Sequence, residues 1–340
     1  MAYRLSILDK ALIPEGVAAP DALDGTVKLA VRADQLGYHR YWFAEHHGMA
    51  TLGSSAPETL AAFVLARTRR IRVGSGGVML QHYPPYKVAE TFNLLAALAP
   101  GRVDLGIGKA PGGLPNATRA LRANQQGAAA QDFAAKLRDL DAFVTGALPD
   151  DHPYAGAIAA PRPEEPASRI LLGASVESAA LAGELGWDFC YAGHFDGDAE
   201  RMGRAFAVYR AATGRSPLLA LVAFAAETEA IARRHVGPLR LYRVRLADGQ
   251  TVNLPNLDAA AEFARQAGVA DYTTEEIVPN VLSGTAAQVR AELDRLHAAF
   301  GVEEFVIDTP VAGFAQRLDS IERLAPLTLS PARAFEARAA

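Results

Sequence analysis

Residues that handle protons cluster in one short run of the sequence. Glu45, His46 and His47 follow directly after the apolar residues 38–44. Because imidazoles donate or accept protons near neutral pH, this run is a candidate acid–base site. A polar loop that faces water is the simpler alternative. A metal site is a third possibility, since His82 and His194 also fall near the ends of predicted strands, although the chain offers no cysteine cluster for it.

A pair of glycines follows the next apolar run. Gly76 and Gly77 come directly after residues 71–75. Paired glycines permit either a tight turn or a backbone that lies very close to a flat ligand. Two prolines and a helical pattern come next, rather than the second strand that a hairpin needs, so we favour the close approach to a ligand.

The third candidate is a cation in a glycine-rich loop. Lys109 follows the apolar residues 103–107. Pro111 prolongs the loop where a dinucleotide fingerprint needs a helix, and no Ser or Thr follows Lys109 as a P-loop requires. What remains is a positive charge suited to a phosphate group.

A helix N-terminus near this cation could hold the same anion. Ser175, Glu177 and Ser178 open a predicted helix at 176–185, whose first turn has free N–H groups and the positive end of the helix dipole. Alternatively, Ser175 only caps that helix.

Eight apolar runs, which alternate with amphipathic helices, position these residues. The predicted strands are residues 3–8, 38–44, 71–75, 103–107, 169–172, 187–191, 218–225 and 304–307. Eight such units favour a single-domain (β/α)8 TIM barrel over a doubly wound sheet. The less regular stretches 146–167 and 241–279 are predicted insertions after the fourth and seventh strands. In a barrel, the candidate residues would gather at the C-terminal ends of the strands.

Composition excludes several classes of partner. The chain has 340 residues, with 34 Lys plus Arg against 38 Asp plus Glu, and its net charge of −4 argues against a nucleic-acid partner. Its longest apolar runs, such as 218–226, are shorter than the roughly 18–20 residues that span a membrane. No charged-then-apolar leader opens the sequence, and Cys190 is the only cysteine, so we expect a cytoplasmic protein without an intrachain disulfide.

Four stretches, in this order, resemble the bacterial luciferase-like, flavin-dependent monooxygenases. They are residues 41–47 (YWFAEHH), 54–58 (SSAPE), 70–80 (RIRVGSGGVML) and 100–112 (PGRVDLGIGKAPG). Looser matches follow at 171–178, 192–195, 283–285 and 305–310, so the resemblance covers most of the chain.

The resemblance implies a (β/α)8 barrel that binds reduced FMN supplied by a separate NAD(P)H:flavin reductase. Oxygen would then form a flavin C4a-peroxide that oxidises a small organic substrate. His46 matches the catalytic histidine of the family. The peptide between Gly76 and Gly77 matches one that is cis and lies under the flavin ring. The resemblance assigns cofactor binding to Glu45, Gly76, Gly77, Lys109, Glu177, Ser178 and His194.

Three positions depart from the family pattern. Lys109 stands where arginine is usual, which keeps the charge but loses the bidentate geometry of a guanidinium. Gly108 replaces a cysteine of luciferase itself, and Leu181 replaces a hydroxyl residue that assists the phosphate there. Light emission is therefore not implied.

Other functions remain open on the same fold. An F420-dependent oxidoreductase would transfer hydride without oxygen, and a non-catalytic relative would only bind flavin; a metal-dependent hydrolase is the most distant alternative. The resemblance also implies a homodimer, with helices near 56–66 and 89–98 in the interface. No residue identifies the substrate.

Overall fold

Eight parallel strands close into a barrel, which confirms the predicted (β/α)8 fold. The computed structural model describes residues 2–123, 132–193, 198–247 and 249–326. Each strand pairs with its neighbour around the ring, β13 with β1 and β8 with β7 completing the closure. The barrel strands are β1 (Arg4–Asp9), β2 (Arg40–Phe43), β3 (Arg72–Ser75), β5 (Val103–Gly108), β6 (Ser168–Gly173), β7 (Asp188–Ala192), β8 (Leu218–Ala225) and β13 (Glu304–Asp308).

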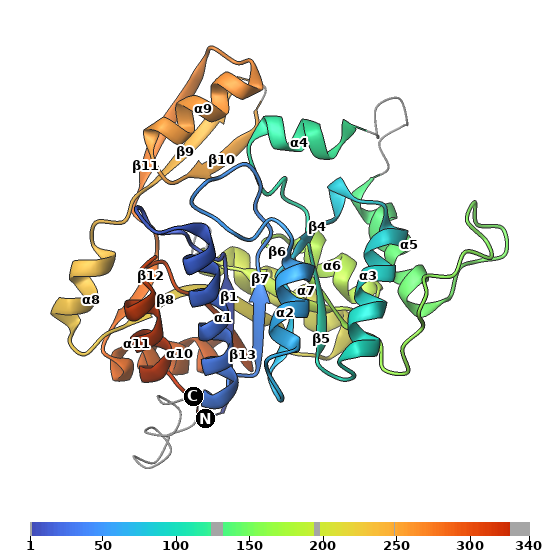
Figure 1. Cartoon of the computed structure of the whole chain (residues 1–340), viewed down its shortest axis with the longest axis horizontal. Helices are drawn as coiled ribbons and strands as arrows, with labels where there is room; N and C mark the ends of the chain where they lie inside the picture. The colour runs from blue at the N-terminus through green and yellow to red at the C-terminus, as the bar shows by residue number, and fades with distance from the viewer. Residues whose placement is uncertain (1, 124–131, 194–197, 248, 327–340) are drawn as a thin grey trace.

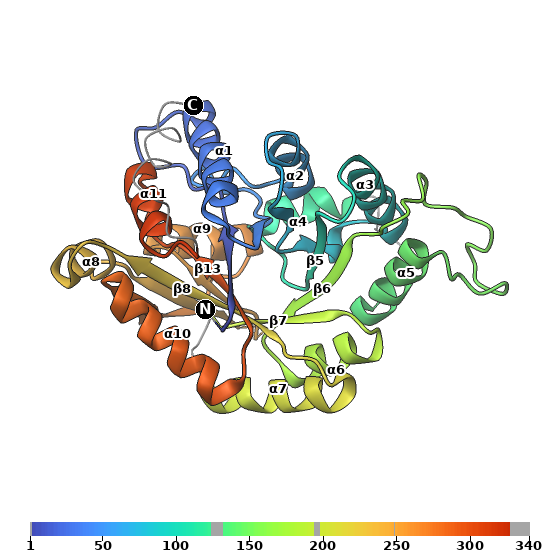
Figure 2. The same ribbon diagram turned by 90° about the horizontal axis from the view of Figure 1, so that it is seen from below.

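Helices form an outer layer around this barrel, as the view along it shows (Figure 2). They are α1 (Ala19–Leu36), α2 (Pro57–Leu65), α3 (Pro85–Leu98), α5 (Phe133–Thr145), α6 (Val176–Glu184), α7 (Ala199–Thr213), α8 (Glu229–Val236), α10 (Ala286–Phe300) and α11 (Phe314–Arg323). Local sequence sets their ends: Gly37 terminates α1 in the left-handed conformation, and Thr285 and Gln288 form a capping box at α10. None of the described helices is long and apolar enough to cross a membrane.

The predicted insertion at 241–279 contains a small sheet that the sequence analysis left without structure. Strands β9 (Leu241–Leu246), β10 (Thr251–Leu254) and β11 (Tyr272–Ile277) pair antiparallel, and α9 (Leu257–Ala267) packs on one face of them. β12 (Val281–Gly284) then adds to β8. By contrast, the insertion at 146–167 contains no helix or strand.

A short helix, α4 (Pro115–Leu121), contacts α9 above the upper ends of the barrel strands (Figure 1). The backbone N–H of Asn116 donates to Oε1 of Gln266 at 2.9 Å, and Arg119 donates to the Gln266 carbonyl oxygen at 2.9 Å. The sequence indicated one helical stretch from about 116 to 144, but α4 and α5 are separate helices. Together, α4 and α9 lie over the C-terminal ends of the barrel strands, and we call this pair of helices the roof (Figure 1).

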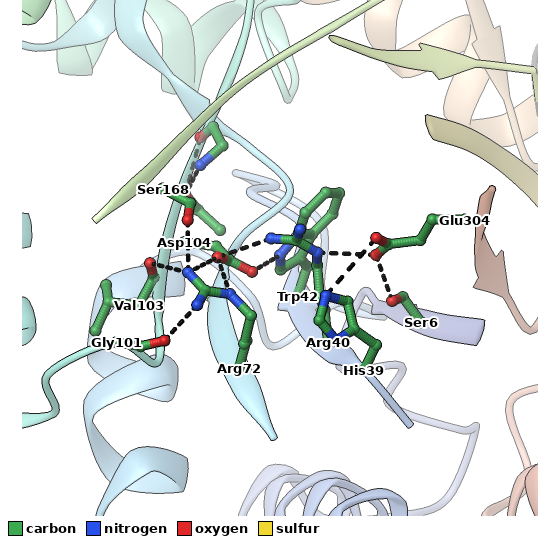
Figure 3. A network of polar contacts seen from close by, with 12 residues as sticks. Ser6, His39, Arg40, Trp42, Arg72, Gly101, Val103, Asp104, Ser168 and Glu304 are labelled. Carbon is green, nitrogen blue, oxygen red and sulfur yellow. Dashed lines mark hydrogen bonds and ion pairs between the residues drawn. The ribbon is translucent and has the colours of Figure 1, made fainter. Parts of the chain in front are cut away.

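Buried charges fill the opposite, N-terminal end of the barrel. Asp104 is fully buried and accepts hydrogen bonds from Trp42 Nε1 and Arg72 Nε, both at 2.8 Å. Arg40 bridges two acids, with 2.9 Å between Nη1 and Asp104 and 2.8 Å between Nε and Glu304 (Figure 3). Because these residues begin different strands, the network fixes how the strands are aligned at this end.

Removing the central charge of this network should destabilise the fold. In Asp104→Asn, two guanidinium groups would share a neutral amide in a buried site. We expect the free energy of unfolding at pH 7, measured by urea titration, to fall by about 3–5 kcal/mol. Glu184→Gln, which breaks the solvent-exposed pair with Arg138, is the control and should cost less than about 1 kcal/mol. A loss that small in Asp104→Asn would contradict the role of the network.

Candidate active site at the mouth of the barrel

The predicted site residues follow four strands that are neighbours in the barrel. Glu45 and His46 follow β2, Gly76 and Gly77 follow β3, Lys109 follows β5, and Glu177 and Ser178 begin α6 after β6. Since β2, β3, β5 and β6 pair in this order, the residues line one arc of the C-terminal rim. His194, predicted beyond β7, lies outside the described residues.

Glu45 is enclosed by groups of the protein itself. Its side chain is 1% exposed. Oε1 lies 2.7 Å from His47 Nε2 and accepts a hydrogen bond from the Tyr83 hydroxyl at 2.9 Å, while Oε2 accepts one from the Met79 backbone N–H at 3.0 Å. The structure thus gives both oxygens of this predicted cofactor ligand partners within the chain.

His46 lies between two residues that are held in place. Its backbone N–H donates to the Ser54 carbonyl oxygen at 3.1 Å, and that of His47 donates to Gly112 at 2.8 Å. The side chains of Glu45 and His47 meet on one side of the chain. The His46 ring itself is half-buried.

The peptide bond between Gly76 and Gly77 is cis, as the resemblance implied. A side chain at either position would collide with the barrel: a Cβ on Gly76 would lie 2.8 Å from Leu8 Cδ1, and one on Gly77 would lie 2.8 Å from the carbonyl carbon of Gly106. The packing of neighbouring strands therefore requires glycine here independently of any ligand. The predicted contact with a flat ligand stays a prediction.

A small residue lies next to this peptide. A Cβ on Gly77 would lie 2.8 Å from the backbone of Gly106 on β5, and Gly106 pairs with Ile170 on β6. Ile170 belongs to a buried apolar cluster with Trp42 and Cys190. The barrel interior is therefore filled by apolar side chains beside this peptide.

Lys109 and the start of α6 form the polar end of the arc. Lys109 is exposed, with Nζ 5.9 Å from the centre of the Phe133 ring. The pKa of Glu177 is lowered, chiefly by a hydrogen bond from its own backbone N–H, then by Ser175, and also by the charge of Lys109. Ser175 Oγ accepts a hydrogen bond from the Ser178 N–H at 3.2 Å, which confirms that Ser175 caps the helix. An anion at this end would meet Lys109 and also a carboxylate.

His82 takes part in a hydrogen-bonded chain. Nε2 lies 2.7 Å from the Pro111 carbonyl oxygen, and Arg122 Nε donates to Nδ1 at 3.3 Å. A carbonyl only accepts, so Nε2 carries the proton and the ring is neutral. Burial lowers the pKa of His82, and the charge of Arg122 lowers it further. Within the described ranges, no group of three or more His, Cys, Asp or Glu side chains could hold a metal ion.

Sequence reasoning missed the groups that hold the site together. Tyr83 lies beyond the motif at 70–80, and Met79 lies within it but contributes a backbone N–H, which no residue type reveals. Gly112 and Gly113 were predicted as flexible loop, but their backbone pairs with that of His47 in the segment after β2. A Cβ on Gly113 would lie 2.3 Å from the His47 carbonyl oxygen, which leaves room only for glycine.

Comparison with known proteins gives a consistent assignment. Residues 4–308 match the family model described as luciferase-like monooxygenase. The chain is 41% identical to N-acetyl-S-alkylcysteine monooxygenase of Bacillus subtilis (strain 168), over 97% of this chain and 99% of that protein. It is 33% identical to a luciferase-like monooxygenase of Escherichia coli (strain K12), over 93% and 94%. The crystal structure of apo-MsnO8 superposes with a TM-score of 0.74 at 32% identity, covering 98% of both chains. The chain therefore belongs to the luciferase-like monooxygenase family.

Proposed function

We propose that this protein is the oxygenating component of a two-component, FMNH2-dependent monooxygenase. The observation that carries the proposal is the arc of the rim on which His46, the cis Gly76–Gly77 peptide and Lys109 follow one another. The named monooxygenases among its sequence relatives support oxygen chemistry over the F420-dependent alternative. In such a reaction one atom of O2 enters the substrate and the other leaves as water, while reduced FMN is oxidised.

The residues at the arc fit the two ends of reduced FMN. Lys109 and the Ser178 hydroxyl would hold the phosphate, and the Gly76–Gly77 peptide would face the ring. Bound there, the flavin would supply the electrons that activate oxygen. Within the described part of the arc, the Glu177 carboxylate opposes this assignment, because it repels a phosphate and occupies a backbone N–H of the helix terminus.

His46 would move the protons that oxygen transfer requires. Its predicted position inside the mouth directs Nδ1 or Nε2 at the reacting groups, and the roof of α4 and α9 would limit the access of water. The chain shows no nicotinamide-binding fingerprint, so we infer that a separate NAD(P)H:flavin reductase reduces the flavin.

The substrate class follows from the Bacillus subtilis relative. Its name states that it acts on N-acetyl-S-alkylcysteine, and its similarity to this chain extends over nearly the full length of both. We propose an N-acylated S-alkylcysteine as the substrate of this protein as well.

Replacing the proposed catalytic histidine should slow the reaction without weakening the binding of reduced FMN. His46→Ala should keep its affinity for reduced FMN but lose product formation by about 100-fold or more, because proton transfer in the transition state contributes that much. Anaerobic flavin titration and product analysis with N-acetyl-S-benzylcysteine measure the two effects. His152→Ala, in the loop that enters the N-terminal end of β6, should behave as wild type. Unchanged turnover in His46→Ala would refute the assignment.

Lys109 after β5 and Glu177 at the start of α6 should act in opposite directions on FMN binding. Lys109→Ala removes the only charge proposed to attract the phosphate and should weaken binding by about 10-fold. Glu177→Gln removes a repelling charge and should tighten binding by about threefold. Fluorescence titration with FMN and with riboflavin, which lacks the phosphate, measures both. Equal effects on the two ligands would place the phosphate elsewhere.

We also propose a homodimer formed through α2 and α3. These neighbouring helices expose large apolar side chains to solvent: Phe63 is 50%, Leu94 50% and Leu98 73% exposed. We take these side chains as the candidate contact surface, in which the Arg67 guanidinium lies over the Phe63 ring at 3.8 Å.

Charges in this patch should separate the protomers. The double variant Phe63→Glu/Leu98→Glu should be a monomer at micromolar concentration, since two acids per protomer would be buried against each other. Val278→Glu, at a side chain that is 70% exposed in the insertion, is the control and should remain a dimer. Light scattering coupled to gel filtration decides the outcome, and a monomeric wild-type protein would refute the proposal.

A further inference from the structure

The Glu45 carboxylate connects three segments of the rim. Its own segment follows β2 and contains His46. Oε2 binds the Met79 backbone in β4 (Val78–Met79), which follows the Gly76–Gly77 peptide, and Oε1 binds Tyr83 just beyond η1 (Leu80–His82). Each bond between segments is 3.0 Å or shorter.

The third segment is the loop that follows Lys109. Oε1 of Glu45 holds the His47 ring, and the His47 backbone N–H binds the Gly112 carbonyl oxygen at 2.8 Å. His47 and Gly113 also form an isolated β-bridge. The carboxylate is thus linked, through one residue, to the loop that carries the proposed phosphate cation.

We propose that Glu45 is a positioning residue that aligns His46 with the Gly76–Gly77 peptide, and that it does not itself bind the cofactor. This inference rests on the proposed function, because the alignment of His46 with the peptide matters only if flavin binds between them. The argument from geometry is that both carboxylate oxygens are buried and already hydrogen-bonded within the chain. The neighbouring His46 is half-buried, and its place in the chain lies between Glu45 and His47, which these bonds hold.

The position specifically requires a carboxylate. Three donors converge on it: His47 Nε2–H, the Tyr83 hydroxyl and the Met79 N–H. Burial raises the pKa of Tyr83, as does the charge of Glu45, so the hydroxyl remains a donor at neutral pH. A carboxylate accepts from all three, whereas glutamine has one amide oxygen and one NH2 group. Because the Met79 N–H can only donate, the amide oxygen of Glu45→Gln would face it, and the NH2 group would face His47 and Tyr83. His47 could then restore its hydrogen bond only by moving its ring proton from Nε2 to Nδ1.

This change of tautomer gives a test on the protein without flavin. Nitrogen-15 NMR of histidine-labelled protein, assigned with His46→Gln and His47→Gln, distinguishes the two tautomers. We expect the Nε2–H form of His47 in the wild type, its loss in Glu45→Gln, and a shift of the His46 signals. Glu58→Gln is the matched control: Glu58 is a half-buried carboxyl close enough to influence Glu45 and His47 electrostatically. It should leave both sets of signals in place.

Kinetics give the second arm. In Glu45→Gln we expect kcat for oxygenation to fall about 10- to 100-fold, with KM and the Kd for reduced FMN within about threefold of wild type, and more hydrogen peroxide released. Glu58→Gln should stay within about threefold in all of these. If Glu45→Gln does not fold, Tyr83→Phe removes a single bond of the network and should lower kcat by about three- to tenfold with the same pattern.

Two results would overturn the proposal. Unchanged histidine signals together with wild-type kcat would show that Glu45 positions nothing. A tenfold loss of flavin affinity with unchanged histidine signals would make Glu45 a cofactor ligand instead. If the wild type oxygenates no substrate, the proposed function fails, while the NMR arm still decides whether Glu45 sets the position of His46.

Discussion

The buried ion pairs at the N-terminal end of the barrel set the geometry on which the rest depends. Asp104 on β5 pairs with arginines from both β2 and β3. A shift of one of these strands along its neighbour would therefore leave a buried charge without its partner. A shift by one residue would exchange the two faces of a strand. The same three strands carry His46, the cis glycine peptide and Lys109 at their opposite ends. Alignment at one end of the barrel therefore determines which side chains meet at the other.

Much of the fold could be predicted because its signals are local. Continuous apolar runs with intervening helical patterns identified all eight barrel strands, and the alternation of strands and helices indicated the closed barrel. The sheet of β9, β10 and β11 was missed because strands such as Leu241–Leu246 alternate polar and apolar residues over only a few positions, between segments that looked irregular. A short alternating segment can be identified as a strand only from the strands that pair with it, and these lie far along the chain.

The site shows the same division between local and long-range information. The run from Glu45 to His47 was recognisable as chemistry, and the glycine pair at 76–77 as a close approach. The function of each member could not be recognised, because it depends on partners such as Tyr83 and Gly112, which lie in segments that follow other strands. The glycines illustrate this best: at 77 and 113 the packing of the protein's own backbone already excludes a side chain, so the sequence signal alone could not separate a structural from a ligand-binding cause.

The central claim, that reduced FMN and oxygen act together at this rim, can be tested by isotope labelling. Anaerobic protein with FMNH2 and N-acetyl-S-benzylcysteine is mixed with 18O2, and the products are analysed by mass spectrometry. Our account predicts one 18O atom in the organic product, formed only when FMNH2 is present. Complete conversion of FMNH2 to FMN and labelled hydrogen peroxide, with no 18O in any organic product, would contradict it.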